Sequence, residues 1–466
     1  MNYKLMNLTG IILAIALIVG CSSPSKKEKD AENMAKLPME EITNKVNEFV
    51  KVELKADISH LSKDQKKMLS HLYDVSKIMD DLFWKEAFGN KDELLKKIDN
   101  KDLETFVKIN YGPWERLNDN KSFIKGYGEK PEGANFYPED MTKEEFENFE
   151  AEDKTSLYTL IRRDKEGNLK TVPYHKAFEK KVKKASKKLK KAAKLAENES
   201  FKKYLKLRAE ALLNDEYLDS DMAWMDVKDN DVEFVVGPIE NYEDGLYGYK
   251  AAHEAFILLK DHDWTEKLDK FNALMPKLQK SLPVAKKYKS EVPGSDSDLG
   301  VYEAVYYAGD CNAGSKTIAI NLPNDERVQE KKGSRKLQLK NAMRYKFEKI
   351  LKPISDELIA KDQRKYIKFD AFFENTMFHE VAHGLGIKQT INDKGTVRNA
   401  LKEYYSPVEE GKADIIGLYL VKQLAEMDEL DDKEIKDNYV TFMASILRSI
   451  RFGAASSHGK ANMMRF

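Results

Sequence analysis

The chain has 466 residues, of which 41% are apolar and 10% aromatic, and this composition excludes a disordered or linker protein because it supplies a large hydrophobic core. The 79 basic and 79 acidic residues cancel, so no global positive field is present to hold nucleic acid, which is not an expected partner. The sequence contains two cysteines, Cys21 and Cys311, and this excludes a disulfide framework.

The N-terminus has the pattern of a bacterial lipoprotein signal. An apolar run over residues 8–20 is shorter than the ~20 residues that a membrane-spanning helix needs, and it ends in an Ile-Val-Gly-Cys-Ser segment that resembles a lipobox. We therefore expect residues 1–20 to be a signal peptide and Cys21 to carry the lipid, which would place the protein in the bacterial cell envelope as a lipid-anchored membrane protein. Residues 21–40 are polar and charged and predict a flexible tether. A signal anchor with an incidental cysteine is the alternative interpretation.

The first part of the remaining chain predicts helices, loops and a hairpin. Apolar residues recur every three or four positions from about residue 39 to 109, which is typical of amphipathic helices. Residues 110–140 are rich in Gly, Pro and Asn and predict loops, after which Thr142 can cap a new helix. Two short alternating runs over residues 157–173 predict a β-hairpin.

A lysine-rich segment follows the hairpin. Residues 176–195 contain ten lysines, which would also suit a nucleic-acid or membrane surface. An apolar stripe at helical spacing runs through the same residues, so we interpret the lysines as the solvated face of a helix and assign them no function. The helical pattern continues over residues 201–213.

Strand patterns appear in the middle of the chain. Residues 232–237 and 301–322 carry β-branched and aromatic runs that predict strands, and a helix is expected between them from about residue 249 to 259. Residues 344–358 and the chain after Asp370 predict helices again. The sequence contains no internal repeat, Walker loop or Gly-rich dinucleotide motif.

A histidine motif lies in this C-terminal helical part. His379-Glu380-Val381-Ala382-His383 occupies a run with apolar residues at helical spacing, for which Asp370 is the expected cap. Residues four apart share a face of a helix, so His379 and His383 can present two imidazoles to one zinc ion, and Glu380 can reach a water on that ion. Because the chain has eight histidines, roughly 0.01 such motifs are expected by chance. Two histidines on an ordinary helix are the alternative.

A catalytic zinc site needs a third protein ligand and an open fourth position. A second helix is predicted to open downstream, with Ser406 as its cap and a proline in its first turn. Glu410 in this helix is the candidate third ligand. It shares a face with Asp414, which we expect to accept the second N–H of a ligand histidine, with Glu409 as a further acceptor. Glu409 also fits a capping-box position, which would give it a structural role only.

These two motifs together carry a resemblance. A zinc helix followed by Glu-Glu-x-x-Ala-Asp at residues 409–414 resembles the dipeptidyl peptidase III family of zinc metallopeptidases, and most of all its shorter branch, which in plants is fused to a Nudix domain. The likeness runs from about Glu41 to the last residue, and no Nudix box occurs. Better-known members carry one extra residue between the two histidines, which leaves substrate preference open. Further stretches similar to this branch are GANFYPED (133–140), SDMAW (220–224), GPIENYEDGLYG (237–248) and INLPNDER (320–327).

The resemblance implies roles for residues outside the zinc motif. Glu240 would hold the free amino group of a peptide, and Tyr242 would hydrogen-bond near the scissile carbonyl. Asn321 and Asn324 would hold the peptide main chain beside an edge strand. His458 would stabilise the transition state together with Tyr242 and the metal. Without the resemblance, we would assign structural roles to Tyr242, Asn321 and Asn324. The histidines left without a function are His60, His71, His175, His253 and His262.

The patterns and the resemblance predict an α+β, mainly helical fold of two lobes around a cleft, with zinc on the helical lobe and a smaller β core in the other. We expect residues 41–255 and 300–330 to form the β-containing lobe and residues 256–299 and 331–466 to form the helical zinc lobe. The expected function is a zinc-dependent peptidase that releases dipeptides from the free N-terminus of short peptides, with Glu380 as the general base. A zinc endopeptidase and a non-catalytic, peptide-binding surface lipoprotein are the alternatives, and no protein partner is indicated.

The last segment of the sequence has no stop signal for a helix. Residues 445–466 keep apolar residues to the end, without Gly, Pro or a polar cap at the last positions. We therefore expect the chain to be cut short and poorly active, with His458 poorly fixed because fraying is greatest near a terminus.

Overall fold

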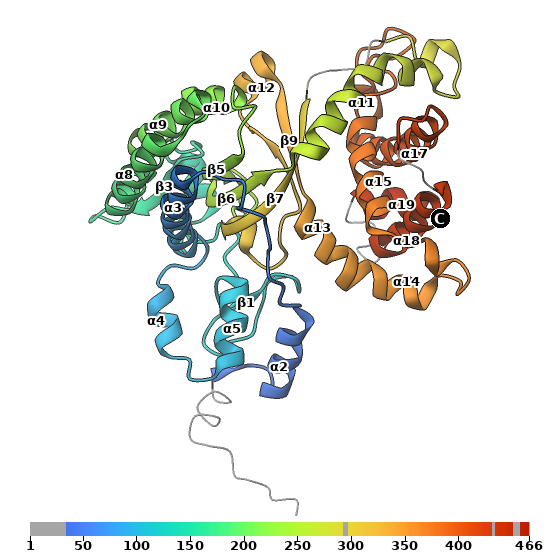
Figure 1. The fold of residues 1–466 in the computed structure, drawn as a ribbon. Helices are drawn as coiled ribbons and strands as arrows, with labels where there is room; N and C mark the ends of the chain where they lie inside the picture. The colour runs from blue at the N-terminus through green and yellow to red at the C-terminus, as the bar shows by residue number, and fades with distance from the viewer. Residues whose placement is uncertain (1–33, 292–296, 431–433, 451–456, 466) are drawn as a thin grey trace, which may run out of the picture.

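The computed structural model describes residues 34–291, 297–430, 434–450 and 457–465. The fold is α+β, mainly helical and divided into two lobes (Figure 1). Its buried apolar residues form two cores. The predicted signal peptide, the lipidation site Cys21 and most of the predicted tether lie outside the described residues. None of the described helices combines the length and the apolar character that crossing a bilayer requires.

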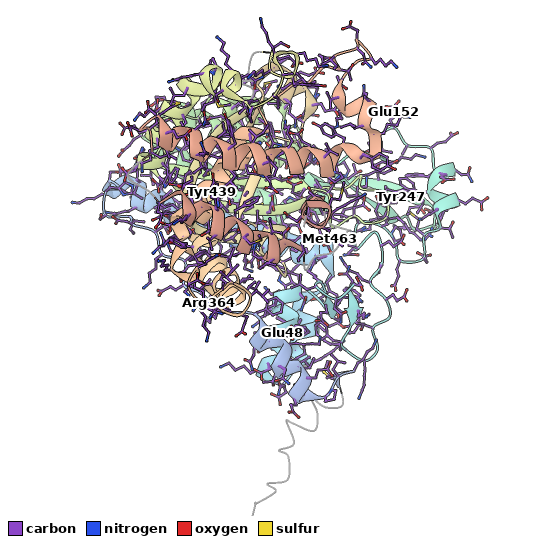
Figure 2. The ribbon with its side chains drawn as sticks, turned by 90° about the vertical axis from the view of Figure 1, so that its right-hand side faces the viewer. Glu48, Glu152, Tyr247, Arg364, Tyr439 and Met463 are labelled. Atoms are coloured by element: carbon purple, nitrogen blue, oxygen red, sulfur yellow. The ribbon has the colours of Figure 1, made fainter. Side chains whose placement is uncertain are left out.

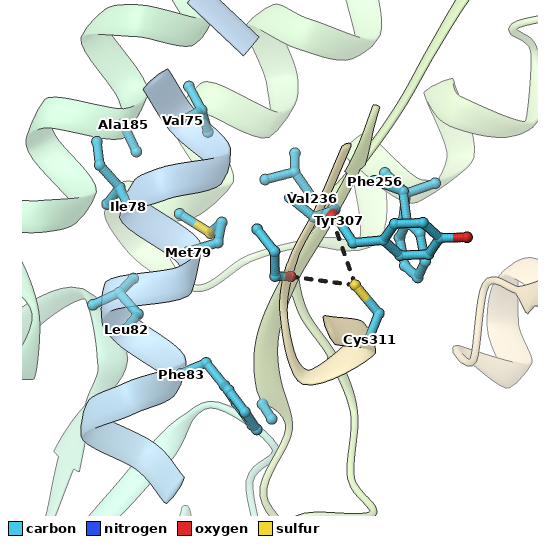
Figure 3. Packing of buried hydrophobic residues seen from close by; sticks show 14 of the residues in the cluster. Val75, Ile78, Met79, Leu82, Phe83, Ala185, Val236, Phe256, Tyr307 and Cys311 are labelled. Carbon is cyan, nitrogen blue, oxygen red and sulfur yellow. Dashed lines mark hydrogen bonds between the residues drawn. The ribbon is translucent and has the colours of Figure 1, made fainter. Parts of the chain in front are cut away.

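Helices begin the first lobe, as the amphipathic spacing predicts. They are α2 (Met39–Glu48), α3 (Lys63–Ala87), α4 (Lys91–Lys96) and α5 (Lys101–Asn110). A capping box starts α3: the Ser62 hydroxyl accepts the Gln65 N–H at 3.0 Å, and the Gln65 amide oxygen accepts the Ser62 N–H at 2.8 Å. The apolar side of α3 packs between the helix that carries Ala185 and the sheet that carries Val236 and Phe256 (Figure 3).

The next elements also follow the predictions. A short pair, β1 (Trp114–Glu115) and β2 (Lys121–Ser122), lies in the loop-rich region, and Thr142 caps α6 (Lys143–Asn148) by accepting the Glu145 N–H at 3.1 Å. The hairpin is formed by β3 (Thr159–Arg163) and β4 (Leu169–Pro173). The lysine-rich segment is helical, and its apolar stripe is buried where this helix packs against α3 (Figure 3). The helices of this region are α7 (Tyr174–Ala177), α8 (Glu179–Leu195), α9 (Glu199–Asn214) and α10 (Leu218–Met225).

A mixed sheet with the strand order β5-β6-β7-β9-β8 separates these helices from the second lobe (Figure 1). Its strands are β5 (Val232–Glu240), β6 (Ala252–Lys260), β7 (Ser297–Gly309), β8 (Ala319–Leu322) and β9 (Ser334–Leu339), with α12 (Glu326–Lys332) between the last two. Neighbouring strands are antiparallel except β7 and β9, which are parallel. The strand β8 is an edge of this sheet, and its Asn321 pairs with Lys336 of β9.

One prediction for this region is wrong, and one strand was not predicted. The helix expected over residues 249–259 is the strand β6, because its run of apolar residues is buried between β5 and β7, and a short apolar run does not distinguish a buried strand from a helix. The strand β9 (SRKLQL) was not predicted, because its charged residues hide the apolar alternation that is typical of a strand. One of them, Arg335, is only 3% exposed, since its guanidinium pairs with Glu233 at 2.8 Å.

The second lobe is helical. Its helices are α11 (His262–Ser281), α13 (Lys340–Lys346), α14 (Lys352–Leu358), α15 (Phe369–Ala382), α16 (Val397–Leu401), α17 (Tyr405–Glu426), α18 (Ile435–Ile450) and α19 (Ser457–Arg465). Its short 3-10 turns are η1 (Lys286–Tyr288), η4 (Arg364–Tyr366) and η5 (Lys402–Tyr404), and η3 (Phe347–Leu351) is a π-helical turn between α13 and α14. The turn η2 (Asp310–Asn312) follows β7 and packs in the core of the first lobe. Tyr439 of α18 and Met463 of α19 lie on the outer face of this lobe, which faces the viewer in Figure 2.

The lobe boundaries differ from the expected ones. The boundary expected between residues 255 and 256 falls inside β6, and residues 334–339 belong to the sheet as β9. Along the sequence, the helical lobe therefore starts with α11. The chain then returns to the sheet for β7, β8 and β9 and re-enters the helical lobe at α13. The reason is that the sheet takes strands from three separate stretches of the chain, which local patterns do not reveal.

Candidate metal centre

The helix α15 carries the histidine motif and is fixed by burial and not by a cap. It starts at Phe369, and no side chain caps it, so the expected cap by Asp370 is wrong. Phe373 packs edge-to-face on Trp264, and Phe378 packs at a tilt on Phe271, with ring centroids 4.9 and 5.1 Å apart. These contacts hold α15 against α11. The helix can form without a side-chain cap, because most helix stability in proteins comes from tertiary packing.

The helix α17 brings the acidic motif to α15. It starts at Tyr405, so Ser406 lies in its first turn and is not the cap expected from the sequence. The two helices touch at Gly417, where a Cβ atom would lie 2.8 Å from the His379 backbone nitrogen. Glycine at this position therefore permits the close approach that places Glu410 and Asp414 beside the histidines.

His379, His383 and Glu410 converge, with one donor atom of each within 4.8 Å of the others. The two Nε2 atoms are 3.2 Å apart, and His379 Nε2 lies 3.2 Å from a Glu410 carboxylate oxygen. Zinc–ligand bonds of about 2.1 Å in a tetrahedron put neighbouring ligand atoms about 3.4 Å apart. The two distances from His379 Nε2 are close to that value, and the whole set lies within 4.8 Å, so these three residues can hold one tetrahedral metal ion with one position left open.

Two carboxylates set the tautomers of the histidines. Asp414 lies 2.7 Å from His379 Nδ1, and Glu409 lies 2.8 Å from His383 Nδ1. Because a carboxylate only accepts hydrogen bonds, each Nδ1 carries the hydrogen, and the Nε2 lone pairs of both rings point at the same space. Two lone pairs 3.2 Å apart repel each other unless a cation or a proton lies between them. The pair therefore suits a metal cation, and without a metal a proton on His379 can take the same place.

The ionisation of the site follows from these contacts. Burial lowers the pKa of His379, but its hydrogen bonds with Asp414 and Glu410 outweigh burial and raise the pKa to about 10. Burial raises the pKa of Glu409, but the hydrogen bonds from His383 and Lys412 outweigh it and hold this pKa below its ordinary value. The raised pKa of His379 shows a negative environment around its imidazole, and Glu409 stays ionised beside His383, so the site attracts a divalent cation.

Glu380 stands beside the histidines and meets a lysine of the sheet. Lys336 Nζ donates to Glu380 Oε2 at 2.9 Å. Burial raises the pKa of Glu380, but the charge and the hydrogen bond of Lys336 and the charges of the two histidines together lower it. Glu380 is therefore ionised at neutral pH and able to accept a proton.

Besides Lys336, three residues that the sequence patterns do not point to shape the site. Lys412 donates to Glu409 at 2.8 Å and to the Leu385 carbonyl at 2.9 Å, so it ties α17 to the end of α15. Gln279 of α11 bonds both the N–H and the carbonyl of Gly386, each at 2.9 Å. Gly417 was also missed. The spacing of small residues along α17 was the available signal for Gly417, whereas the partner of Gln279 lies 107 residues away and leaves no local signal.

The sheet carries the other predicted residues. Asn324 donates to Glu240 and to the Ile239 carbonyl, both at 3.2 Å, so the ends of β5 and β8 meet here. Burial raises the pKa of Glu240, and the Asn324 bond offsets part of that rise. Tyr242 is 80% exposed and borders a cavity of about 940 Å³. Asn321 is exposed on the edge strand. His458 falls in α19, and its side chain lies outside the described part of the structure.

The chain is similar to a known protein family and to a known plant protein. The pattern of the family described as "Peptidase family M49" matches residues 141–394. "Nudix hydrolase 3" from Arabidopsis thaliana is 35% identical over 91% of this chain, which spans 63% of that protein's length.

Solved structures are also similar. The structure of DPP III from Caldithrix abyssi is 43% identical, with a TM-score of 0.84 over 90% of this chain and 82% of that one. The structure of dipeptidyl-peptidase III from Corallococcus sp. strain EGB is 37% identical, with a TM-score of 0.73 over 91% and 81% of the two chains. The family pattern includes the histidine motif of α15, and both solved structures cover about nine tenths of this chain.

Proposed function

This chain belongs to peptidase family M49, and on that premise we propose that it is a zinc-dependent peptidase that releases dipeptides from the free N-terminus of short peptides. The observation that carries the proposal is the convergence of His379, His383 and Glu410 with Glu380 beside them. A peptide-binding lipoprotein without activity has no need of a proton acceptor next to three metal ligands.

The donor set favours zinc. Two imidazole nitrogens and one carboxylate oxygen are the ligands of a common class of catalytic zinc site, and they leave an open position for water or substrate. When bound, zinc supplies a Lewis acid and lowers the pKa of water. The protein contributes the ligand orientation, because Asp414 and Glu409 hold both rings with Nε2 toward the metal position.

Glu380 is the proposed general base. Its carboxylate is ionised and partly exposed, so it can take a proton from the attacking water and deliver it to the leaving amine. Replacing this carboxylate by an amide keeps the shape of the side chain and removes the proton acceptor. Glu380→Gln should therefore keep the metal and lose hydrolysis.

The sheet is the proposed peptide-binding side. The strand β8 is an edge of the described sheet, so a peptide main chain can pair along it beside Asn321. Glu240 and Asn324 already contact each other where β5 and β8 end, and the carboxylate of Glu240 can hold a peptide's ammonium group. By family resemblance, Tyr242 and His458 stabilise the negative charge that develops on the scissile carbonyl.

The experiment that tests the function compares two forms of one peptide. The zinc-loaded protein is incubated with a short peptide that has a free N-terminus and with its N-acetylated form, and the fragments are identified by mass spectrometry. We expect successive dipeptides from the free form and none from the acetylated form. Glu380→Gln, which keeps the metal ligands, is the matched inactive control. Equal cleavage of both forms would show an endopeptidase, and no cleavage of either would contradict a peptidase.

We also propose that the protein is lipid-anchored through Cys21. The support is the lipobox-like segment that follows the apolar run of residues 8–20. Several acyl chains on one cysteine give stable membrane attachment, whereas one chain gives only reversible binding.

A further inference from the structure

Lys336 of β9 reaches from the sheet to the helix that carries the metal motif. Its Nζ lies 2.9 Å from Glu380 Oε2, and the two side chains are 16% and 22% exposed. Lys336 therefore contacts the residue that the proposed function uses as general base. Neither the histidine motif nor the acidic motif in the sequence points to this lysine.

The position of Lys336 in the sheet adds a second observation. In the β8–β9 pair, Lys336 lies directly opposite Asn321, and directly opposed residues of an antiparallel pair have side chains on the same face. Asn321 belongs to the edge strand along which the peptide is proposed to pair. One face of the β8–β9 pair thus carries both Asn321, which is proposed to bind the peptide, and Lys336, which contacts Glu380.

We propose that Lys336 is a positioning residue for the peptidase reaction, which fixes the carboxylate of Glu380 from the strand next to the bound peptide. This inference rests on the proposed function of Glu380. A free glutamate side chain has several rotamers, and ordering it costs conformational entropy. A charge-assisted hydrogen bond to one carboxylate oxygen restricts the plane of the group and hence the direction of the other oxygen.

A purely structural ion pair is the competing explanation, and the chain offers a matched control for it. Lys45 of α2 lies 2.9 Å from a Glu115 carboxylate oxygen, and these side chains are 17% and 11% exposed. The distance and the burial resemble those of the Lys336–Glu380 pair. The Lys45 pair lies in the first lobe, away from α15, so losing it affects the fold and not the reaction.

The test compares kcat and KM of zinc-loaded Lys336→Met, Lys336→Arg and Lys45→Met on a peptide with a free N-terminus. We expect Lys336→Met to lower kcat by about tenfold, which equals about 1.4 kcal/mol, while KM changes little and zinc content stays at wild-type level. Lys336→Arg should restore most of the rate, because it keeps the charge and the donor. Lys45→Met should keep the wild-type kcat.

Two kinetic results would overturn the inference in an active wild-type enzyme. One is a wild-type kcat in Lys336→Met, and the other is a rise in KM alone, which would indicate ordinary substrate binding. A wild-type protein that cleaves no peptide would contradict the proposed function itself, so the two failures are distinguishable.

A second readout does not depend on activity. A double-mutant cycle measures the thermal midpoint of the zinc-loaded wild type, Lys336→Met, Glu380→Gln and the double variant. If the contact exists in solution, Lys336→Met lowers the midpoint more in the wild-type background than in the Glu380→Gln background. Equal decreases in both backgrounds would show that the two side chains do not interact, and the inference would fail.

Discussion

Adding one methyl group at Gly417 should separate the two helices that build the metal site. A Cβ atom there would lie 2.8 Å from the His379 nitrogen, 2.9 Å from the Phe378 carbonyl carbon and 3.0 Å from the His379 Cα. Ordinary contact begins at 3.4 Å, so α17 has to move away from α15 by about 0.6 Å at this point. Zinc–ligand distances tolerate only about 0.2 Å, so Glu410 no longer fits a metal held by the histidines. We expect Gly417→Ala to weaken zinc binding by about tenfold or more.

Stability should fall as well. Overpacking costs about 1–3 kcal/mol, and alanine returns about 0.5–1 kcal/mol of helix propensity, so the net loss is about 1 kcal/mol. Gly411 is the matched control, because it lies on the same helix and a Cβ atom there meets nothing within 4 Å. Gly411→Ala should gain about 0.5–1 kcal/mol and keep zinc. The assays are chelator competition for zinc and denaturant unfolding. Wild-type zinc affinity with increased stability in Gly417→Ala would refute the packing argument.

Three further predictions test other parts of the molecule. Glu243 is 4% exposed, and its contact with Arg116 at 2.6 Å predicts a loss of about 3–5 kcal/mol in Glu243→Ala, measured by urea unfolding at pH 7. Burial raises the pKa of Glu243, but Arg116 and a neighbouring lysine outweigh it and keep this pKa below its ordinary value. Its contribution to stability is therefore present above pH ~4.5 and lost as the pH falls through the folded pKa, and Glu243→Gln should lack this part of the acid dependence. Asp414→Ala removes the acceptor of His379 Nδ1 and should weaken zinc binding about 10–100-fold in a chelator titration, whereas an unchanged affinity would exclude the orienting role. Cys21→Ala should leave the membrane fraction on cell fractionation, and its retention there would exclude the lipid as the anchor.

The sequence predicted elements best where one local pattern determines the structure. The amphipathic helices before residue 110, the Thr142 cap and the hairpin of β3 and β4 all form where expected, because their signals lie within a few residues. The pattern of β6 predicts a helix, because the burial that makes it a strand comes from its neighbours β5 and β7 and not from its own residues. Tertiary burial overrides local propensity in such segments.

In the candidate site, too, residues within a local motif could be predicted and residues brought in from distant parts of the chain could not. Residues of the histidine and acidic motifs could be named because residues four apart on a helix share a face. Lys336 could not be named, because its contact with Glu380 joins residues 44 positions apart through the fold of a strand that looked too polar to be one. The helix starts were also misplaced: Asp370 and Ser406 are good caps in isolation, but packing of α15 and α17 starts both helices earlier.

The central claim is that His379, His383 and Glu410 hold one zinc ion. A crystal structure of the zinc-loaded protein, with anomalous scattering recorded on both sides of the zinc absorption edge, measures this directly. We predict a single strong peak bound by Nε2 of both histidines and a carboxylate oxygen of Glu410, at distances of about 2.0–2.2 Å. A peak bound by other residues, or no peak between α15 and α17 at full zinc loading, would contradict the assignment.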